Sequence, residues 1–228
     1  MRSIMAAFAV LLYTTAAQAT VTDNFNRADA LTLGDNYDVE SGSFRISGNK
    51  AITTNFVSLA TYNNSDSVAA GLDASLRGID SGSYVALSFG YDTGQSYFIK
   101  VQDNNGDGFF DHYGFDTGNN DLNGVFLDLN SPFQTGAVDV SVNGSVATLS
   151  IFANGFTQSY FFDYGYAPGS TRVGFGLNRL GVADNFHFDG VASGNDVPEP
   201  ATWALMISGF GLAGAAARRR RSTSLALA

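Results

Sequence analysis

The stretch AVDVSVNGSVATLSIFANGFTQSYFF, residues 137–162, decides the fold class of this chain. Apolar and polar side chains alternate with a period of two over residues 138–142 and 146–152, which is typical of half-buried β-strands. The pairs Asn143-Gly144 and Asn154-Gly155 interrupt the alternation, and both are favoured in tight hairpin turns. The stretch therefore predicts three consecutive antiparallel strands, at residues 137–142, 146–153 and 156–162.

The same two-residue period recurs outside this stretch, in residues 67–77, 84–89 and 96–101, and turn residues separate these runs. No stretch between residues 20 and 196 has the convincing period of an amphipathic helix. About a dozen strands of this kind predict an all-β domain, built as a two-sheet antiparallel sandwich.

Two pairs of adjacent aromatic residues lie on predicted strands, Phe109-Phe110 and Phe161-Phe162. Neighbours on a strand point to opposite faces of the sheet, so one member of each pair is expected to leave the core. Exposed aromatic rings beside amide and carboxylate side chains commonly stack sugar rings. Core packing is the alternative for most aromatic residues of the domain.

The N-terminal residues carry the pattern of a secretory signal peptide. Arg2 is the basic residue, residues 4–13 are apolar, and Ala17-Gln18-Ala19 has the small-x-small form of a cleavage site. We expect residues 1–19 to be removed after Ala19 and Thr20 to begin the mature protein.

The C-terminal residues combine Pro198-Glu199-Pro200, an apolar run at residues 201–217 and the arginines at 218–221. As a helix, the apolar run rises roughly 25 Å, slightly less than a hydrocarbon core of about 30 Å. It is therefore a short transmembrane segment. The basic cluster predicts a cytoplasmic end, residues 222–228 included, and an exported domain at residues 20–196.

This order resembles the PEP-CTERM sorting signal of Gram-negative bacteria. The resemblance rests on Pro198, Glu199 and Pro200, the apolar run, and the cluster Arg218, Arg219, Arg220 and Arg221. It implies processing by an exosortase, a membrane transpeptidase. It also implies that the protein is anchored by the helix before it is sorted to the cell envelope or an extracellular matrix.

Charge and cysteine content exclude several classes of function. The chain has 12 basic and 21 acidic residues, a formal net charge of −9, and no cysteine. Because Arg2 and the arginines at 218–221 lie outside residues 20–196, the exported domain is more acidic than the whole chain. Nucleic acid is not an expected partner, since its phosphates would be repelled. Thiol catalysis, zinc-thiolate sites and a disulfide scaffold are excluded.

A second resemblance covers most of the exported domain. Asp23-Asn24-Phe25-Asn26-Arg27, Leu33-Gly34, Gly42-Ser43-Phe44-Arg45-Ile46 and the closing residues 181–189 are similar to the first and last strands of concanavalin A-like lectins and glucanases. The resemblance implies a jelly-roll sandwich whose last strand pairs beside the first. Members of this fold bind glycans, bind proteins or cleave polysaccharides.

The residues needed for glycan cleavage are missing. Glucanases of this fold use two glutamates in an E-x-D-x-(x)-E pattern, and Glu40 is the only glutamate between residues 20 and 196. His112 and His187 lie on predicted strands without a catalytic motif around them. The sequence predicts a protein that is not an enzyme, with a polysaccharide hydrolase as the alternative.

One stretch has the spacing of a metal-binding loop, Asp103-Asn104-Asn105-Gly106-Asp107-Gly108-Phe109-Phe110-Asp111. Oxygen ligands at loop positions 1, 3, 5 and 9, with glycine at position 6, match the front of many calcium loops. The predicted calcium ligands are Asp103, Asn105, Asp107 and Asp111.

The alternative is a plain hairpin turn between strands at residues 97–102 and 109–115. Position 12 is Gly114 instead of a bidentate glutamate, and strands flank the loop where an EF-hand has helices. Since Asn tolerates the same turns, changing Asp103 and Asp107 to Asn is expected to abolish calcium binding and barely alter the hairpin.

These features predict an exported, exosortase-sorted envelope or matrix protein that associates with extracellular polysaccharide through a lectin-like β-sandwich. The alternatives are a polysaccharide-acting hydrolase and a protein-binding adhesive module. The sequence identifies no ligand-binding residue.

Overall fold

The computed structural model describes residues 20–91, 93, 95–117 and 121–189. The predicted signal peptide with Ala17 and Ala19, the sorting residues from Pro198 to Arg221 and the membrane segment at 201–217 lie outside these residues. Among the described residues, no helix is long and apolar enough to cross a membrane.

Every regular element in the described part is a β-strand, which confirms the all-β prediction. The strands are β1 (Thr20–Asp23), β2 (Tyr37–Ser41), β3 (Phe44–Ile46), β4 (Ala51–Thr53), β5 (Ser58–Tyr62), β6 (Ala69–Leu76), β7 (Ser83–Phe89), β8 (Tyr97–Asp103), β9 (Phe110–Thr117), β10 (Asp121–Phe133), β11 (Thr135–Asn143), β12 (Val146–Ala153), β13 (Phe156–Asp163), β14 (Val173–Asn178) and β15 (Gly181–Asp189).

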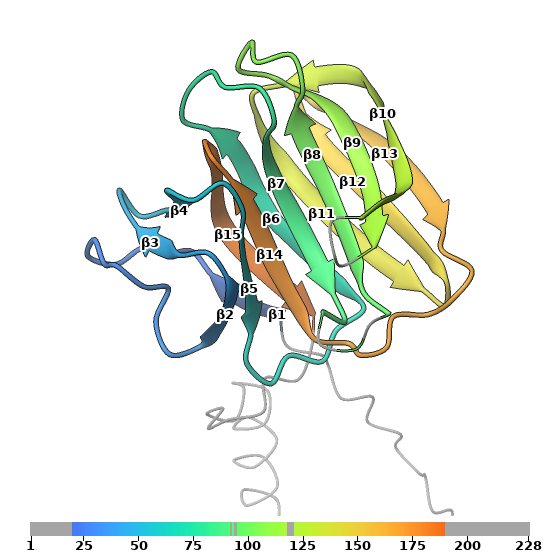
Figure 1. Ribbon diagram of the computed structural model, residues 1–228, viewed down its shortest axis with the longest axis horizontal. Helices are drawn as coiled ribbons and strands as arrows, with labels where there is room; N and C mark the ends of the chain where they lie inside the picture. Colours follow the sequence, from blue (N-terminus) through green and yellow to red (C-terminus); the bar gives the residue numbers. More distant parts are fainter. Residues whose placement is uncertain (1–19, 92, 94, 118–120, 190–228) are drawn as a thin grey trace, which may run out of the picture. The chain divides into compact units, whose positions relative to one another are not determined.

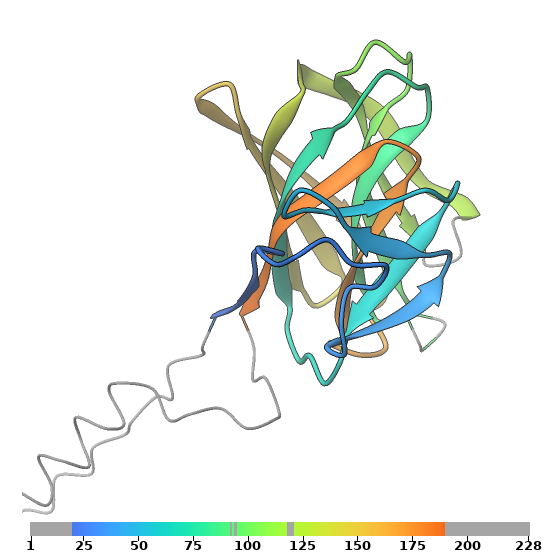
Figure 2. The same cartoon turned by 90° about the vertical axis from the view of Figure 1, so that its left-hand side faces the viewer.

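The strands form two antiparallel sheets stacked as layers (Figures 1 and 2). Sheet A has eight strands in the order β13-β12-β11-β6-β15-β4-β3, with β1 paired to β15. Sheet B has seven strands in the order β10-β9-β8-β7-β14-β5-β2. This is the predicted two-sheet sandwich. Fragment 20–196 contains the whole described fold and is called the ectodomain below.

The hairpins predicted from residues 137–162 are confirmed. Strand β12 pairs antiparallel with β11 and with β13, and the Val140↔Leu149 and Ser150↔Ser159 pairs fix the register. At the second turn, Asn154 and Gly155 both have positive φ, 54° and 83°. Two-residue hairpin loops favour this conformation, and Asn-Gly adopts it at little cost.

Other pairings join strands that are distant in the sequence. Strand β6 lies between β11 and β15, and β14 lies between β7 and β5. The last strand, β15, pairs with the first, β1, as the lectin and glucanase resemblance implied. The first and last residues of the described sandwich, Thr20 and Asp189, are therefore register partners within sheet A.

The core between the sheets is rich in aromatic side chains. The buried Phe175 ring on β14 packs edge-on against Phe25, Tyr37 and Phe44, at centroid distances of 5.8, 5.8 and 5.3 Å. The buried Phe186 ring on β15 contacts Phe175 from sheet A. These contacts connect the two sheets, since aromatic pairs contribute beyond their buried area.

The F-x-R stretch at residues 25–27 has a structural role. Arg27 donates to both carboxylate oxygens of Asp23, at 2.7 and 3.1 Å, and to the carbonyl oxygen of Leu33, at 2.6 Å. These bonds hold the turn that places Phe25 in the core, although Phe25 has a positive φ of 50°.

At one edge of the sandwich, a glutamine side chain links the two sheets. The amide of Gln158 on β13 accepts a hydrogen bond from the Ser131 backbone N–H and donates one to the Ser131 carbonyl oxygen on β10. The Tyr160 hydroxyl accepts from the backbone N–H of Asn130. These side chains give hydrogen-bond partners to backbone groups of β10, an edge strand of sheet B. Such groups on an edge strand otherwise have no partner within the sheet.

The outer face of sheet B is largely buried at its centre. Lys100 and Asp116 lie on neighbouring strands of this face, with 2.9 Å between Nζ and Oδ2 and side-chain exposures of 6% and 1%. The Lys100 ammonium also lies 5.5 Å from the Tyr84 ring centroid and 5.3 Å from that of Phe126. Strands β7 and β8 thus carry buried residues on both faces, and their alternation in sequence does not mark one face as solvent-exposed.

Candidate functional site

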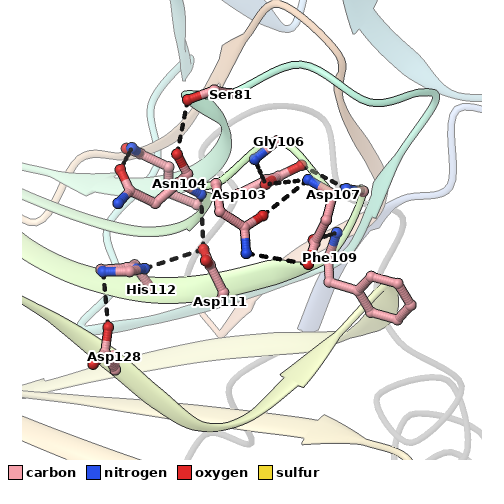
Figure 3. A network of polar contacts seen from close by, with 12 residues as sticks. Ser81, Asp103, Asn104, Gly106, Asp107, Phe109, Asp111, His112 and Asp128 are labelled. Carbon is pink, nitrogen blue, oxygen red and sulfur yellow. Dashed lines mark hydrogen bonds and ion pairs between the residues drawn. The ribbon is translucent and has the colours of Figure 1, made fainter.

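The predicted metal-binding loop connects β8 to β9 and is organised by the buried carboxylate of Asp103 (Figure 3). Its Oδ1 accepts hydrogen bonds from the backbone N–H groups of Gly106, at 2.6 Å, and Asp107, at 3.3 Å. Its Oδ2 accepts from the N–H of Gly108, at 2.9 Å. The chain can wrap around one carboxylate because Gly106 and Gly108 both have positive φ, 78° and 87°.

The other three predicted ligands also accept hydrogen bonds from the loop backbone. Oδ1 of Asn105 accepts from the Asp107 N–H, and Oδ1 of Asp107 accepts from the Phe109 N–H, each at 2.9 Å. Oδ1 of Asp111 accepts from the Asn104 N–H at 2.7 Å. Such local bonds are typical of Asx turns.

A histidine at the base of the loop lies between two carboxylates (Figure 3). The Nδ1 atom of His112 is 3.1 Å from Asp111, and its Nε2 atom is 2.8 Å from Asp128 on β10. The imidazole stacks on the Phe126 ring, at a centroid distance of 4.8 Å. Sequence reasoning treated His112 as an isolated strand residue, because Asp128 reaches it only through the pairing of β9 with β10.

The structure places Asp103, Asn105, Asp107 and Asp111 in one loop. In the described part of the chain, however, no three His, Asp or Glu side chains form a group that could hold a metal ion. The calcium assignment stays a prediction. One expectation changes: Asn at position 103 has a single side-chain acceptor oxygen, whereas both oxygens of Asp103 accept from the loop backbone, so Asp103→Asn is expected to weaken the hairpin.

A second polar cluster, missed by the sequence analysis, lies on the outer face of sheet A. Nε2 of His187 on β15 is 3.2 Å from Oδ1 of Asp139 on β11, and Nδ1 is 2.9 Å from the carbonyl oxygen of Asn185. The two strands are separated by β6, where Gly71 pairs with both residues. A Cβ atom at Gly71 would collide with the Asp139 carboxylate and the His187 ring, so glycine is what allows them to meet.

The pKa of His187 is raised above its ordinary value. The largest cause is the hydrogen bond to Asp139, followed by partial burial, which opposes the shift; the Asn185 carbonyl and the charges of Asp139 and Asp73 add to it. Only the imidazolium form can donate from both ring nitrogens to these two acceptors.

The contact between His187 and Asp139 should make the free energy of unfolding depend on pH. Because the folded-state pKa of His187 is raised, its contribution is complete below the unfolded-state pKa of about 6.5 and is lost as the pH rises through the folded value. The side chains are partly exposed, so we expect His187→Gln to cost up to about 1 kcal/mol near pH 5 and nearly nothing near pH 9. Urea unfolding of both proteins across this range measures the difference. A cost that is equal at both ends would contradict the assignment.

Two aromatic rings are exposed on the same outer face. Phe161 on β13 is 79% exposed and Phe152 on β12 is 54% exposed. Phe162, which follows Phe161 in the sequence, packs on the core. In the other aromatic pair, Phe109 in the loop is 43% exposed and Phe110 on β9 is fully buried. The prediction that one member of each aromatic pair leaves the core is confirmed.

Comparison with known families identifies the C-terminal signal. The family model of the PEP-CTERM protein-sorting motif matches residues 196–221. The predicted sorting motif is therefore confirmed, and it implies export and membrane-anchored sorting to the envelope. No curated protein matches this sequence.

Solved structures similar to the sandwich include legume lectins and a lectin-like protein. Lectin II from Ulex europaeus has a TM-score of 0.54 at 10% identity, over 76% of this chain and 99% of its own. Winged bean acidic lectin, solved with methyl-α-D-galactose, has a TM-score of 0.52 at 8% identity, over 75% and 97%. Arcelin-5, a lectin-like defense protein from Phaseolus vulgaris, has a TM-score of 0.51 at 8% identity, over 76% and 98%. At these identities the likeness shows the fold alone.

Proposed function

We propose that this chain is an exported, non-enzymatic protein of the cell envelope or extracellular matrix that associates with extracellular polysaccharide. The observation that carries the proposal is the outer face of sheet A, where the exposed rings of Phe152 and Phe161 lie among hydroxyl and carboxylate side chains. Rings and hydrogen-bonding groups in this combination suit sugars. The lectin-like fold and the sorting motif are consistent with such a role.

The surroundings of Glu40 support a non-enzymatic function. Its carboxylate accepts a hydrogen bond from the Thr61 hydroxyl, at 2.6 Å, and lies 3.3 Å from the Arg172 guanidinium. These contacts hold the Glu40 side chain against β5 and the residue before β14. Retaining glycoside cleavage uses two carboxyl groups that face each other, and residues 20–196 contain no second glutamate.

A glycan array tests the proposal directly. The ectodomain is applied to neutral and acidic glycans, once with calcium and once with a chelator. The proposal expects binding to a defined set of glycans without release of reducing ends. Binding to no glycan would overturn it, and reducing ends released from a bound polysaccharide would favour the hydrolase alternative. If calcium occupies the loop and supports the site, the chelator should weaken binding.

A further inference from the structure

The outer face of sheet A carries two neighbouring hollows. The first, of about 160 Å³, is lined by Ser141, Thr148, Ser150, Asp139 and His187. The second, of about 390 Å³, is lined by Lys50, Asp73, Phe152, Asn154 and Asp184. The two hollows lie next to each other along the strands. Ser150 pairs with Asp139 at the first hollow. Two residues further along β12, Phe152 pairs with Ala137 at the second hollow.

One exposed aromatic ring lines the second hollow, and another lies beside the first. Phe152 lines the second hollow, and Phe161 is the register partner of Thr148, which lines the first. Residues 148 and 152 are separated by four residue steps along β12, so the two rings lie roughly 13 Å apart along the strand direction. A ligand that contacts both must be an extended chain. A single sugar ring is too short.

The charged groups of the two hollows are mostly carboxylates. Asp139 lines the first hollow with the hydroxyl groups of Ser141 and Ser150. Asp73 and Asp184 line the second hollow with one cation, Lys50. Carboxylates accept hydrogen bonds readily from hydroxyl groups. A neutral glycan offers many such donors, whereas a uronic-acid polymer would bring negative charge onto an already acidic face.

We propose that a neutral polysaccharide chain binds across sheet A, with sugar rings stacked on Phe161 and Phe152 and sugar hydroxyl groups donating to Asp139 and Asp73. This inference rests on the proposed function and names its face and ligand class. The contact of His187 with Asp139 over Gly71 holds that carboxylate at the first hollow.

Titration calorimetry of the ectodomain tests the proposal, with cellohexaose, xylohexaose and mannohexaose as neutral probes and a galacturonic-acid hexamer as the anionic one. We expect at least one neutral hexamer to bind more tightly than the anionic hexamer and than its own monosaccharide. Phe161→Ala and Phe152→Ala should each weaken this binding tenfold or more. Phe109→Ala, an exposed ring in the loop after β8, is the matched control and should change affinity less than twofold.

The outcomes separate this inference from the function on which it rests. Suppose that wild type binds a glycan, and that Phe161→Ala and Phe152→Ala bind it as well as Phe109→Ala does. The binding site is then not on the outer face of sheet A, while the proposed function stands. Tighter binding of the galacturonic-acid hexamer would overturn the ligand class. Binding of no probe, together with an empty glycan array, would overturn the proposed function. Both rings are exposed, so melting temperatures close to wild type should accompany each variant.

Discussion

Replacing Lys100 by methionine is expected to lower the free energy of unfolding by about 3–5 kcal/mol. The change leaves the carboxylate of Asp116, whose side chain is only 1% exposed, without its cation. The pKa of Tyr84 is raised, first by burial and then by the negative charge of Asp116, so this tyrosine stays neutral and adds no second negative charge. Chemical denaturation of the ectodomain at neutral pH measures the loss.

The double variant with Lys100→Met and Asp116→Leu separates a buried charge from lost packing. Removing both partners leaves no unpaired charge, and apolar replacements of similar volume are often tolerated. We therefore expect the double variant to be more stable than Lys100→Met alone. Arg172→Met is the more exposed control, because its partners Asp38 and Glu40 are 60% and 21% exposed, and it should cost about 1 kcal/mol or less. A Lys100→Met protein as stable as this control would contradict the account of the pair.

Replacing Asp103 by alanine is expected to cost roughly 3 kcal/mol, because the backbone N–H groups of Gly106 and Gly108 lose their acceptor. The Asp107 N–H loses its 3.3 Å bond to Asp103 and keeps the 2.9 Å bond to Asn105. Asp107→Ala is the control in the same loop, since the exposed Asp107 accepts a single backbone N–H, from Phe109, and should cost about 1 kcal/mol or less.

Calcium and a chelator distinguish the two roles of this loop. If Asp103 acts by accepting backbone hydrogen bonds, the cost of Asp103→Ala in thermal or urea unfolding is the same with calcium and with chelator. If calcium binds the folded loop, wild type gains stability with calcium, by about 2.7 kcal/mol at a hundredfold excess over Kd. A cost that appears only with calcium would show that the backbone bonds contribute little.

The fold was predictable where the information is local. Residues 137–162 combine a two-residue period with two turn signals, and these features set the strands and their register together. Asn154-Gly155 forms the second loop, whereas the first loop is Gly144-Ser145, since Asn143 pairs with Val146. Neighbouring residues on a strand point to opposite faces, which explains why Phe161 is exposed while Phe162 packs on the core. The placement of β6 between β11 and β15 depends on contacts between distant segments, and no local pattern encodes it.

The candidate sites, too, depend on contacts that no local sequence pattern encodes. The spacing of Asp103, Asn105 and Asp107 identified oxygen-rich side chains, but it could not show that the loop's own N–H groups use those oxygens. The pair of Asp139 and His187 was missed because a third strand, with Gly71, brings the two residues together. A glycine within an otherwise alternating strand was the available signal, since it marks close approach of neighbouring groups.

Chemical-shift mapping tests the central claim most directly. The isotope-labelled ectodomain is titrated with the neutral hexasaccharide that binds most tightly, and backbone amide shifts are followed. The account predicts that the largest changes lie on the outer face of sheet A, around Thr148, Ser150, Phe161 and His187. Changes confined to sheet B or to the loop after β8, with none on this face, would contradict it.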